Sequence, residues 1–302
     1  MKVLITGGTG LVGRALTGRL VQRGHRVAIL SRGKGTAIGF PDGVSVRTWD
    51  AKTVDDLVEH LEAADAVVHL AGENIGDGRW TTSRKARILT SRVDSTRALT
   101  EALGRAEPKP KTLVQASAVG FYGPHGDRDL SESDEIGTDF LATVCGAWEA
   151  ASSEVPALGI RRVVARTGVV LSRSGGALPR MVLPFRLFVG GPVGSGSQWI
   201  SWIHLEDLVG ALEHLLFHEQ TEGPYNLCAP EPVTNRVFSK AIGKVMGRPC
   251  WFPVPAFMIR TLLGEMATIV LEGQRAAPQR LIDSGYAFRF PQVGEALHDL
   301  LQ

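Results

Sequence analysis

The sequence predicts an α/β protein, built as a doubly wound parallel sheet with a smaller C-terminal lobe. Short apolar runs alternate with helical patterns through the first half of the chain, which is typical of a parallel sheet covered by helices on both faces. A glycine-rich turn joins the first apolar run to the first helical pattern. After Gly168 this rhythm gives way to short segments punctuated by glycine and proline, which indicate a loop-rich lobe.

Each element is expected from its periodicity and its flanking turn residues. Strands are expected at Lys2–Thr6, Arg26–Ser31, Ala66–Leu70, Thr112–Ala116 and Arg162–Ala165. Helices are expected at Leu11–Arg23, Val54–Ala63, Ser83–Leu103 and Leu141–Ser153. We assign residues 1–170 to the sheet domain, with 198–222 returning to it, and residues 171–197 and 223–302 to the smaller lobe, which we expect to bind substrate.

Composition excludes several classes of protein. The net charge is +2, from 33 basic and 31 acidic side chains, so no broad field favours nucleic acid or an anionic membrane as a partner. No apolar run approaches the roughly 18 residues of a membrane helix. The three cysteines form no CxxC pair, which argues against a disulfide framework or a cysteine zinc site. We therefore expect a cytoplasmic protein.

The glycine-rich turn has the spacing of a dinucleotide site, with glycines at Gly7, Gly10 and Gly13 between a strand and a helix. Such glycines permit a tight turn, a close approach of the backbone to a pyrophosphate, and close packing of helix on sheet. The residues between them are Thr9, Leu11 and Val12. Backbone N–H groups at the helix start would bind the anion. The first domain is therefore expected to be a nucleotide-binding Rossmann domain.

The end of the second strand favours NADP(H) over NAD(H). An acidic residue there would hold a free ribose 2′-hydroxyl, but the strand ends in Ser31 and Arg32, and no acid appears before Asp42. Arg32 can pair with a 2′-phosphate, with Ser31 and Lys34 as further donors. The alternative is that Arg32 is an exposed loop residue.

Longer motifs resemble those of the extended short-chain dehydrogenases/reductases, and more closely the atypical epimerase-family branch of the SDR39U type. They cover nearly the whole chain and lie at Ala71–Trp80, Ser117–Gly123, Phe185–His204, Asn226–Asn235 and Glu272–Leu281. The resemblance implies a Rossmann domain, a small C-terminal lobe and bound NADP(H), but no single activity for the branch.

The resemblance also implies cofactor contacts beyond the glycine turn. Asp50 corresponds to a residue near the adenine, although an acid before a helix is also a common cap. Leu70, Ala71 and Gly72 correspond to the segment beneath the ribose and pyrophosphate. Thr167 and Gly168 correspond to the segment beside the nicotinamide.

The catalytic tyrosine and lysine that such a resemblance implies are not found. Typical members carry a lysine four residues after the tyrosine, which lowers the barrier to proton transfer by the phenol. The residues four positions beyond the three tyrosines, Tyr122, Tyr225 and Tyr286, are Gly126, Ala229 and Phe290. Aligned on the corresponding helix, Leu141 and Cys145 occupy the two positions. The serine that orients substrate aligns on Ala118, or on Ser117 after a shift of one residue.

Four polar residues follow the expected strand ends, Glu73, Asn74, Ser117 and Tyr122, and the catalytic candidates among them are Glu73, Ser117 and Tyr122. Doubly wound folds bind ligands at the carboxyl ends of their strands. Tyr122 is a candidate hydrogen-bond donor and Glu73 a candidate general base. The alternatives are aromatic packing for Tyr122 and a cap or salt bridge for Glu73.

Polar residues of the lobe are expected to face the substrate, with bonding to the lobe backbone as the alternative. They are Arg186, Gln198, Trp199, Gln274 and Arg275. The expected substrate is a small carbonyl or hydroxyl compound or a nucleotide sugar. His214 and His218 lie four apart, but without HExxH or a third ligand no metal site is predicted.

Two functions are compatible with this sequence. The first is an NADP(H)-dependent oxidoreductase or epimerase with altered proton-transfer residues. The second is a non-catalytic NADP(H)-binding sensor whose lobe presents a surface to a partner. The helices at Ser83–Leu103 and Leu141–Ser153 correspond to a dimer interface in many extended relatives, but their many charges leave a monomer and a homodimer both open.

Overall fold

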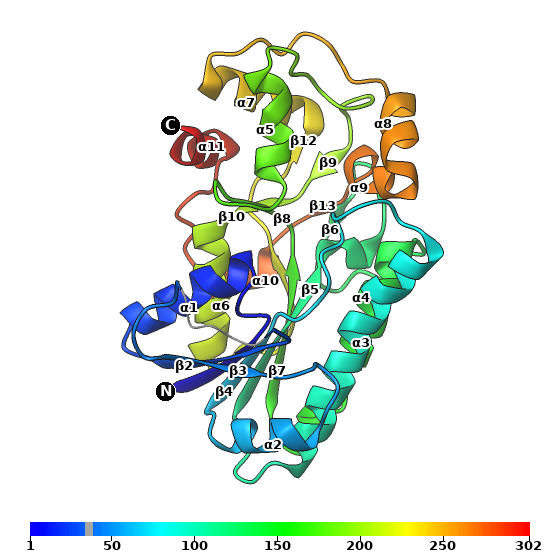
Figure 1. Cartoon of the computed structure of the whole chain (residues 1–302). Coiled ribbons are helices and arrows are strands. Elements are labelled where there is room, and N and C mark those ends of the chain that lie inside the picture. The colour runs from blue at the N-terminus through cyan, green and yellow to red at the C-terminus, as the bar shows by residue number, and fades with distance from the viewer. Residues whose placement is uncertain (34–38) are drawn as a thin grey trace.

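A computed structural model describes residues 1–33 and 39–302 and confirms the doubly wound fold (Figure 1). Within these residues a seven-stranded sheet has the order β11-β7-β5-β4-β1-β2-β3, and every neighbouring pair is parallel. Its strands are β1 Lys2–Thr6, β2 Arg26–Ser31, β3 Val44–Thr48, β4 Ala66–His69, β5 Thr112–Ala118, β7 Arg161–Thr167 and β11 Gly223–Leu227. The strand order reverses between β1 and β4, which is where such sheets bind ligands.

Helices cover both faces of the sheet. They are α1 Leu11–Gln22 and α6 Leu205–Phe217 on one face, and α2 Asp55–Glu62, α3 Thr82–Arg105 and α4 Phe140–Ala150 on the other. Alternate residues of β1 serve the two layers: Val3 and Ile5 join the core under α1 and α6, whereas Leu4 joins the core under α2 and α3. This alternation follows from the two-residue period of a strand.

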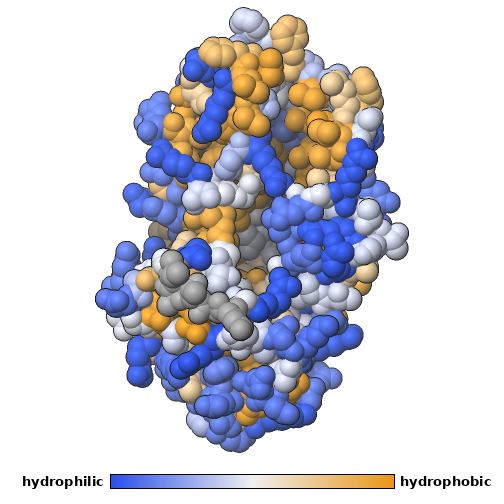
Figure 2. All heavy atoms as spheres, in the orientation of Figure 1, coloured by the Kyte–Doolittle hydropathy of each residue, from blue (hydrophilic) through white to orange (hydrophobic). Residues whose placement is uncertain are grey.

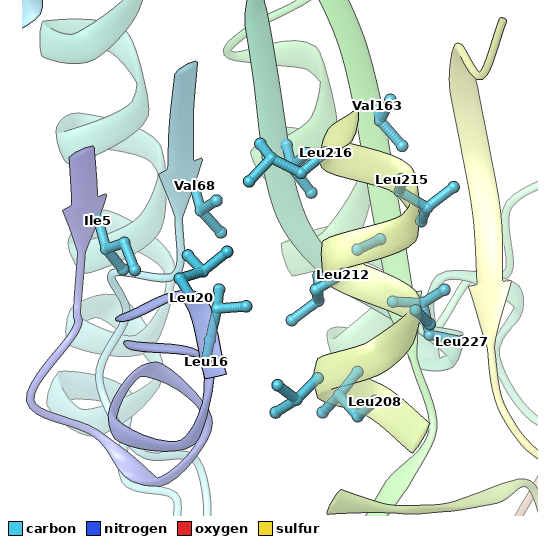
Figure 3. Packing of buried hydrophobic residues seen from close by; sticks show 14 of the residues in the cluster. Ile5, Leu16, Leu20, Val68, Val163, Leu208, Leu212, Leu215, Leu216 and Leu227 are labelled. Atoms are coloured by element: carbon cyan, nitrogen blue, oxygen red, sulfur yellow. The ribbon is translucent and has the colours of Figure 1, made fainter. Parts of the chain in front are cut away.

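Leucines on α1 and α6 anchor the first of these layers. Figure 3 shows Leu16 and Leu20 of α1 directed at Ile5 and Val68. The leucines of α6 point into the same core; they are Leu208, Leu212, Leu215 and Leu216. Burying each leucine stabilises the fold by about 1.5–3 kcal/mol, so the layer fixes the start of α1, and with it the glycine turn, against the sheet.

The smaller lobe is made of short strands and helices around a separate apolar cluster. Its strand pairs are β8 Val169–Leu171 with β10 Trp202–His204, β9 Trp199–Ile200 with β12 Val233–Thr234, and β6 Asp129–Leu130 with β13 Arg275–Ala276. Its helices are α5 Leu178–Arg186, α7 Asn235–Met246, α8 Ala256–Leu263, α9 Thr268–Leu271 and α11 Val293–Leu301. Helix α10 Gln279–Asp283 packs on the central sheet through Leu281. Short 3₁₀ helices are η1 Val119–Tyr122, η2 Val155–Leu158 and η3 Gly264–Ala267.

The boundary expected at residue 223 is wrong, because β11 pairs with β7 at the edge of the central sheet. Leu281, Tyr286 and Phe288 also pack on the sheet core, so part of the C-terminal segment returns to the first domain. Within 198–222 only α6 covers the sheet, since β10 pairs with β8 outside it. Across the described part of the chain, no helix has the length and apolarity that crossing a membrane requires.

Candidate functional site

The glycine turn between β1 and α1 is packed too closely for larger residues. Gly7 has a φ of 69°, and a Cβ there would lie 2.7 Å from the carbonyl carbon of Leu70. A Cβ on Gly13 would lie 2.7 Å from the carbonyl oxygen of Gly7. The turn is therefore held against the segment that follows β4, and the first turn of α1 is held against the glycine loop.

The N-terminus of α1 opens onto free space at Gly10. Gly10 is the N-cap and provides no side-chain cap, and the atom nearest to a Cβ placed there is the carbonyl oxygen of Gly7, at 3.4 Å. The Thr9 carbonyl accepts a 3.0 Å hydrogen bond from Nε of Arg14, which fixes the loop. Helix-start N–H groups without side-chain caps bind anions, so this turn fits the pyrophosphate of a dinucleotide.

Leu11 and Val12 form the first residues of α1. The Leu11 side chain lies beneath a second glycine loop, because Cβ atoms on Gly175 and Gly176 would be 3.7 and 3.3 Å from its methyl carbons. This loop follows β8, so the lobe borders the candidate cofactor site at the helix start.

The residues expected to favour NADP(H) lie at and just after the end of β2. Ser31 is half-buried and Arg32 is exposed, and Lys34 lies outside the described residues. The Asp50 carboxylate accepts bonds from the backbone N–H and hydroxyl of Thr53, at 2.7 Å each, and from the Lys52 N–H at 2.8 Å. These bonds lower the pKa of Asp50. Asp50 therefore acts as a cap of the turn before α2.

His69 is a polar residue of this region that the sequence analysis missed. It ends β4, is fully buried, and bonds the hydroxyls of Thr6 (2.6 Å) and Thr96 (2.9 Å). Burial lowers the pKa of His69 to about 4, so the imidazole is neutral. It ties the start of the glycine turn to α3.

The segment after β4 brings Gly72, Glu73 and Arg92 together. Leu70 donates its backbone N–H to Thr6 at 3.0 Å, and Ala71 follows it, half-buried. A Cβ on Gly72 would lie 3.1 Å from the guanidinium carbon of Arg92. The Glu73 carboxylate pairs with Arg84, and with Arg87 at 3.4 Å. The salt-bridge alternative for Glu73 is therefore the arrangement present here.

Ser117 belongs to a chain of bonds beneath the strand ends. Its hydroxyl donates to Oε1 of Glu149 at 2.6 Å. Arg166 of β7 binds the same carboxylate through two N–H···O bonds, both of 2.9 Å. This bidentate geometry is the strong form of an arginine–carboxylate pair. It fixes the end of β5 to α4 and β7.

Tyr122 lies at the centre of this network and is fully buried. Its hydroxyl donates to Oδ1 of Asn226 at 2.7 Å and accepts a 3.1 Å bond from Arg166. Burial raises the pKa of Tyr122 to about 12, so the phenol is neutral. The backbone N–H of Asn226 in turn donates to Glu132 at 3.0 Å. The Tyr122 hydroxyl therefore bonds to Asn226 and Arg166 inside the protein and does not point to a ligand site.

Leu141 and Cys145 of α4 pack against η1. A Cβ on Gly120 would lie 3.3 Å from Cβ of Leu141 and 4.0 Å from Sγ of Cys145. Burial raises the pKa of Cys145 to about 12, so the thiol is neutral near pH 7. Ala118 precedes η1 as its N-cap residue.

At the end of β7, Thr167 bonds weakly to the Ala165 carbonyl at 3.4 Å. The Ser201 backbone crosses directly over Gly168 and leaves no room for a Cβ. The close approach of the lobe therefore explains why residue 168 is a glycine. The Ser201 carbonyl of the lobe accepts a 2.7 Å hydrogen bond from the backbone N–H of Val169.

Most of the lobe residues expected to face a substrate bond within the lobe. Gln198 donates to the carbonyls of Val193 (3.0 Å) and Val270 (2.8 Å). Arg275 stacks on the ring of Trp199, whose indole N–H donates to Asp127 at 2.8 Å. The other two residues are Gln274, whose carbonyl accepts a 2.8 Å bond from Ser201, and Arg186, which is exposed at the end of α5.

The histidine pair of α6 has a structural partner. Nε2 of His214 lies 3.0 Å from the Ser284 hydroxyl, and the rings of His214 and His218 lie 5.0 Å apart. In the described ranges, no three His, Cys, Asp or Glu side chains group as metal ligands.

A glycine turn at the switch point of a doubly wound sheet, bordered by a smaller lobe, defines a nucleotide-binding protein of the extended short-chain type. The chain belongs to the NAD dependent epimerase/dehydratase family, whose profile matches residues 3–228. A second profile, described as a domain of unknown function (DUF1731), matches residues 254–300.

Relatives of this family cover the chain from end to end. Epimerase family protein SDR39U1 of Bos taurus is 40% identical, over 100% of both chains. Epimerase family protein YfhF of Bacillus subtilis is 39% identical, over 100% of this chain and 98% of its own. The crystal structure of human SDR39U1 with NADPH has a TM-score of 0.89 at 38% identity and covers 99% of each chain. The resemblance drawn from the motifs is thereby confirmed.

Proposed function

We propose that the chain is an NADP(H)-dependent oxidoreductase or epimerase that works without the usual catalytic tyrosine and lysine. The observation that carries this proposal is the glycine turn, where protein backbone fills the Cβ positions of Gly7 and Gly13 and space remains at Gly10. The NADPH named with the 38% identical human relative supports the choice of cofactor. A bound nicotinamide cofactor would supply the hydride chemistry.

The roles of the cofactor-binding residues follow from their places. The glycine turn binds the pyrophosphate at the start of α1. Ser31 and Arg32 bind the 2′-phosphate, which Arg32 can reach because its side chain is exposed at the end of β2. Leu70 to Gly72 follow β4 at the switch point, and Thr167 ends β7. They line the path toward the nicotinamide, because doubly wound sheets bind ligands at the carboxyl ends of their strands.

The candidate catalytic residues hold the strand ends and helices around the site in place, through bonds to other side chains. Glu73 is paired with Arg84, Ser117 with Glu149, and Tyr122 with Asn226. Each polar end therefore holds a strand end or a helix in place. The guanidinium of Arg92 lies beside Gly72, on the proposed path to the nicotinamide. The substrate is a small carbonyl or hydroxyl compound or a nucleotide sugar.

The cofactor assignment predicts that NADPH binds at least about tenfold more tightly than NADH, because a charge-assisted contact with the 2′-phosphate contributes about 1.5–3 kcal/mol. Arg32→Ala should remove the preference and leave NADH affinity unchanged. Fluorescence titration of both cofactors against both proteins measures this. Equal affinities in the wild type, or a preference that survives Arg32→Ala, would contradict the assignment.

A non-catalytic NADP(H)-binding sensor is the second candidate, favoured by the internal pairing of Glu73, Ser117 and Tyr122. Single-turnover NADPH oxidation over a panel of carbonyl compounds and nucleotide sugars separates the two. Oxidation of NADPH by one of these compounds supports the enzyme. This turnover should persist in Cys145→Ala, because the neutral thiol supplies none of the positive charge that a lysine at this position would supply. NADPH binding without oxidation by any compound supports the sensor.

A further inference from the structure

Exposed apolar side chains concentrate on two segments of the lobe. Within the described residues, nine of the fourteen large apolar side chains that are exposed lie in 183–189 and 251–262. They are Leu183, Leu187, Phe188, Val189, Trp251, Phe252, Phe257, Met258 and Leu262. Figure 2 shows apolar atoms gathered over the lobe on both sides of a hollow. Patches of this kind usually mark a binding surface.

The first wall of this hollow is a face of α5. Arg180, Leu183 and Leu187 follow the three- and four-residue spacing that places side chains on one side of a helix. Arg180 donates to the Gly76 carbonyl at 2.7 Å and pairs with Asp77 at 3.3 Å. Leu183 and Leu187, which are 53% and 64% exposed, therefore line the side that faces the loop after β4.

The second wall is α8, which reaches the same loop. Arg79 donates to the carbonyls of Thr261 (2.8 Å) and Leu262 (2.9 Å), at the C-terminal end of α8. No residue of α8 itself is buried. The loop from Gly72 to Trp80 thus forms a floor, bonded to α5 through Gly76 and to α8 through Arg79.

The two wall segments themselves carry charge of one sign, whereas the acidic residues beside them, Glu73, Asp77 and Glu265, are paired with Arg84, Arg180 and Lys85. Segments 171–205 and 232–264, which contain both walls, carry no acidic residue. Their basic residues are Arg173, Arg180, Arg186, Arg236, Lys240, Lys244, Arg248 and Arg260. The whole chain has a net charge of only +2, so the field around the hollow favours an anion.

A cation without a carboxylate partner lies at the end of the floor. Among the described residues no carboxylate oxygen lies within 4.0 Å of the Arg92 guanidinium, although Arg92 is half-buried. The guanidinium stacks at 5.0 Å on the ring of Trp148, donates to the Ile88 carbonyl at 3.0 Å, and lies against exposed Gly72. A partly buried charge left without a counterion is typical of a site for an anionic ligand.

We propose that the hollow between α5 and α8 binds a small amphiphilic anion, with its apolar chain between the two helices and its carboxylate at Arg92. The chain would cover Leu183, Leu187 and the apolar face of α8, and so remove their surface from water. The guanidinium would supply a charge-assisted pair for the head group. This proposal rests on the function proposed above for the place of the cofactor, and it applies to the enzyme and to the sensor alike.

The test is calorimetric titration of the full chain with decanoate, decan-1-ol and UDP-glucose, with and without saturating NADPH. Decanoate should bind. The double variant Leu183→Ser and Leu187→Ser should weaken decanoate and decan-1-ol by at least about tenfold, because the apolar contact is lost. Arg92→Gln should weaken decanoate by about tenfold and decan-1-ol by less than about threefold, and Arg92→Lys should restore part of the loss. Ile282→Ser, which alters an exposed apolar residue of α10, is the matched control.

Several results would overturn the proposal: no binding of decanoate, tighter binding of UDP-glucose, or the same loss in Ile282→Ser. Binding to phosphatidylglycerol vesicles without binding of monomeric decanoate would assign the surface to a membrane instead. A dimer that becomes a monomer in the double variant would assign it to a second copy of the chain. Decanoate binding in a protein that fails to bind NADPH would leave this site intact and remove only the proposed function.

Discussion

Buried polar side chains that bond to one another fix the strand ends around the candidate site. His69 bonds Thr6 and Thr96, and Arg166 bonds Glu149 and Tyr122. A buried polar group that loses its partner costs about 1–3 kcal/mol. The cofactor turn therefore rests on interior contacts that involve no ligand.

His69 predicts a loss of stability in weak acid. Its ordinary pKa is 6.5, and burial lowers it to about 4 in the folded chain. The unfolded chain therefore gains a proton first as the pH falls, so the stability that neutral His69 provides above pH 6.5 is lost between about pH 6.5 and pH 4. Between pH 7.5 and 5.5 the free energy of unfolding should fall by about 1.3 kcal/mol more in the wild type than in His69→Gln.

Urea denaturation of both proteins at the two pH values measures this difference. The variant carries every other titrating group of the wild type, so the comparison isolates His69. Parallel losses in the two proteins would show that the other histidines with lowered pKa values, which are His25, His60, His204 and His214, account for the whole effect.

At the residue scale, the spacing of glycines in the sequence predicted the glycine turn, but it did not predict the buried side-chain contacts around the site. Gly7, Gly10 and Gly13 are one local motif, and their roles depend on backbone geometry that recurs wherever this motif follows a strand. Arg92, Glu149 and Arg166 come from two helices and a strand far apart in the chain. The pairing of Glu149 with Arg166 and the stacking of Arg92 on Trp148 depend on how α3 and α4 pack on the sheet, which periodicity does not specify.

Helix α1 contains a matched pair of glycines that tests the fit of the turn. A Cβ on Gly13 would meet the backbone of Gly7 and Gly8, whereas nothing lies within 4 Å of a Cβ on Gly18. Gly18→Ala should raise the free energy of unfolding by about 0.5–1 kcal/mol, because alanine favours a helix, and should leave NADPH affinity unchanged.

Gly13→Ala should instead lower the free energy of unfolding, by at least about 1 kcal/mol, since the helix start must shift away from the turn. NADPH affinity should fall by at least about tenfold, because the helix N–H groups move with it. Chemical denaturation and NADPH titration of the two variants measure both effects. Equal NADPH affinity in the two variants would show that the helix start does not hold the cofactor.

At the scale of elements, the first half was predictable and the lobe was not. The expected strand Arg26–Ser31 and the helix beginning at Leu11 have the observed bounds to within one residue. Strand β3 was missed because its alternating residues are half-buried and exposed. The lobe strands are two or three residues long, which is too short to show the alternation of apolar and polar residues that predicts a strand. Strand β11 was placed in the lobe because glycine and proline begin it.

At the scale of the whole molecule, polar and apolar side chains are exposed on different parts of the surface. The outer side of α3 is polar: Arg87, Asp94, Arg97 and Glu101 are exposed along it. None of the exposed large apolar residues in the described ranges lies on α3 or α4. The apolar surface lies instead on α5 and α8, across the hollow from one another. The two helices expected to form a dimer interface therefore lack the apolar centre that such interfaces have.

We therefore predict a monomer of 32.5 kDa at micromolar concentration, because a stable interface needs an apolar centre and about 1,200–2,000 Å² of buried surface. Size-exclusion chromatography with light scattering, at low and at physiological salt, measures the mass. A dimer at low salt alone would indicate pairing through the charges of α3, which salt screens. A dimer at both salt concentrations that Arg97→Glu leaves intact would contradict the prediction and direct attention to α5 and α8, since apolar contacts persist when charges are screened.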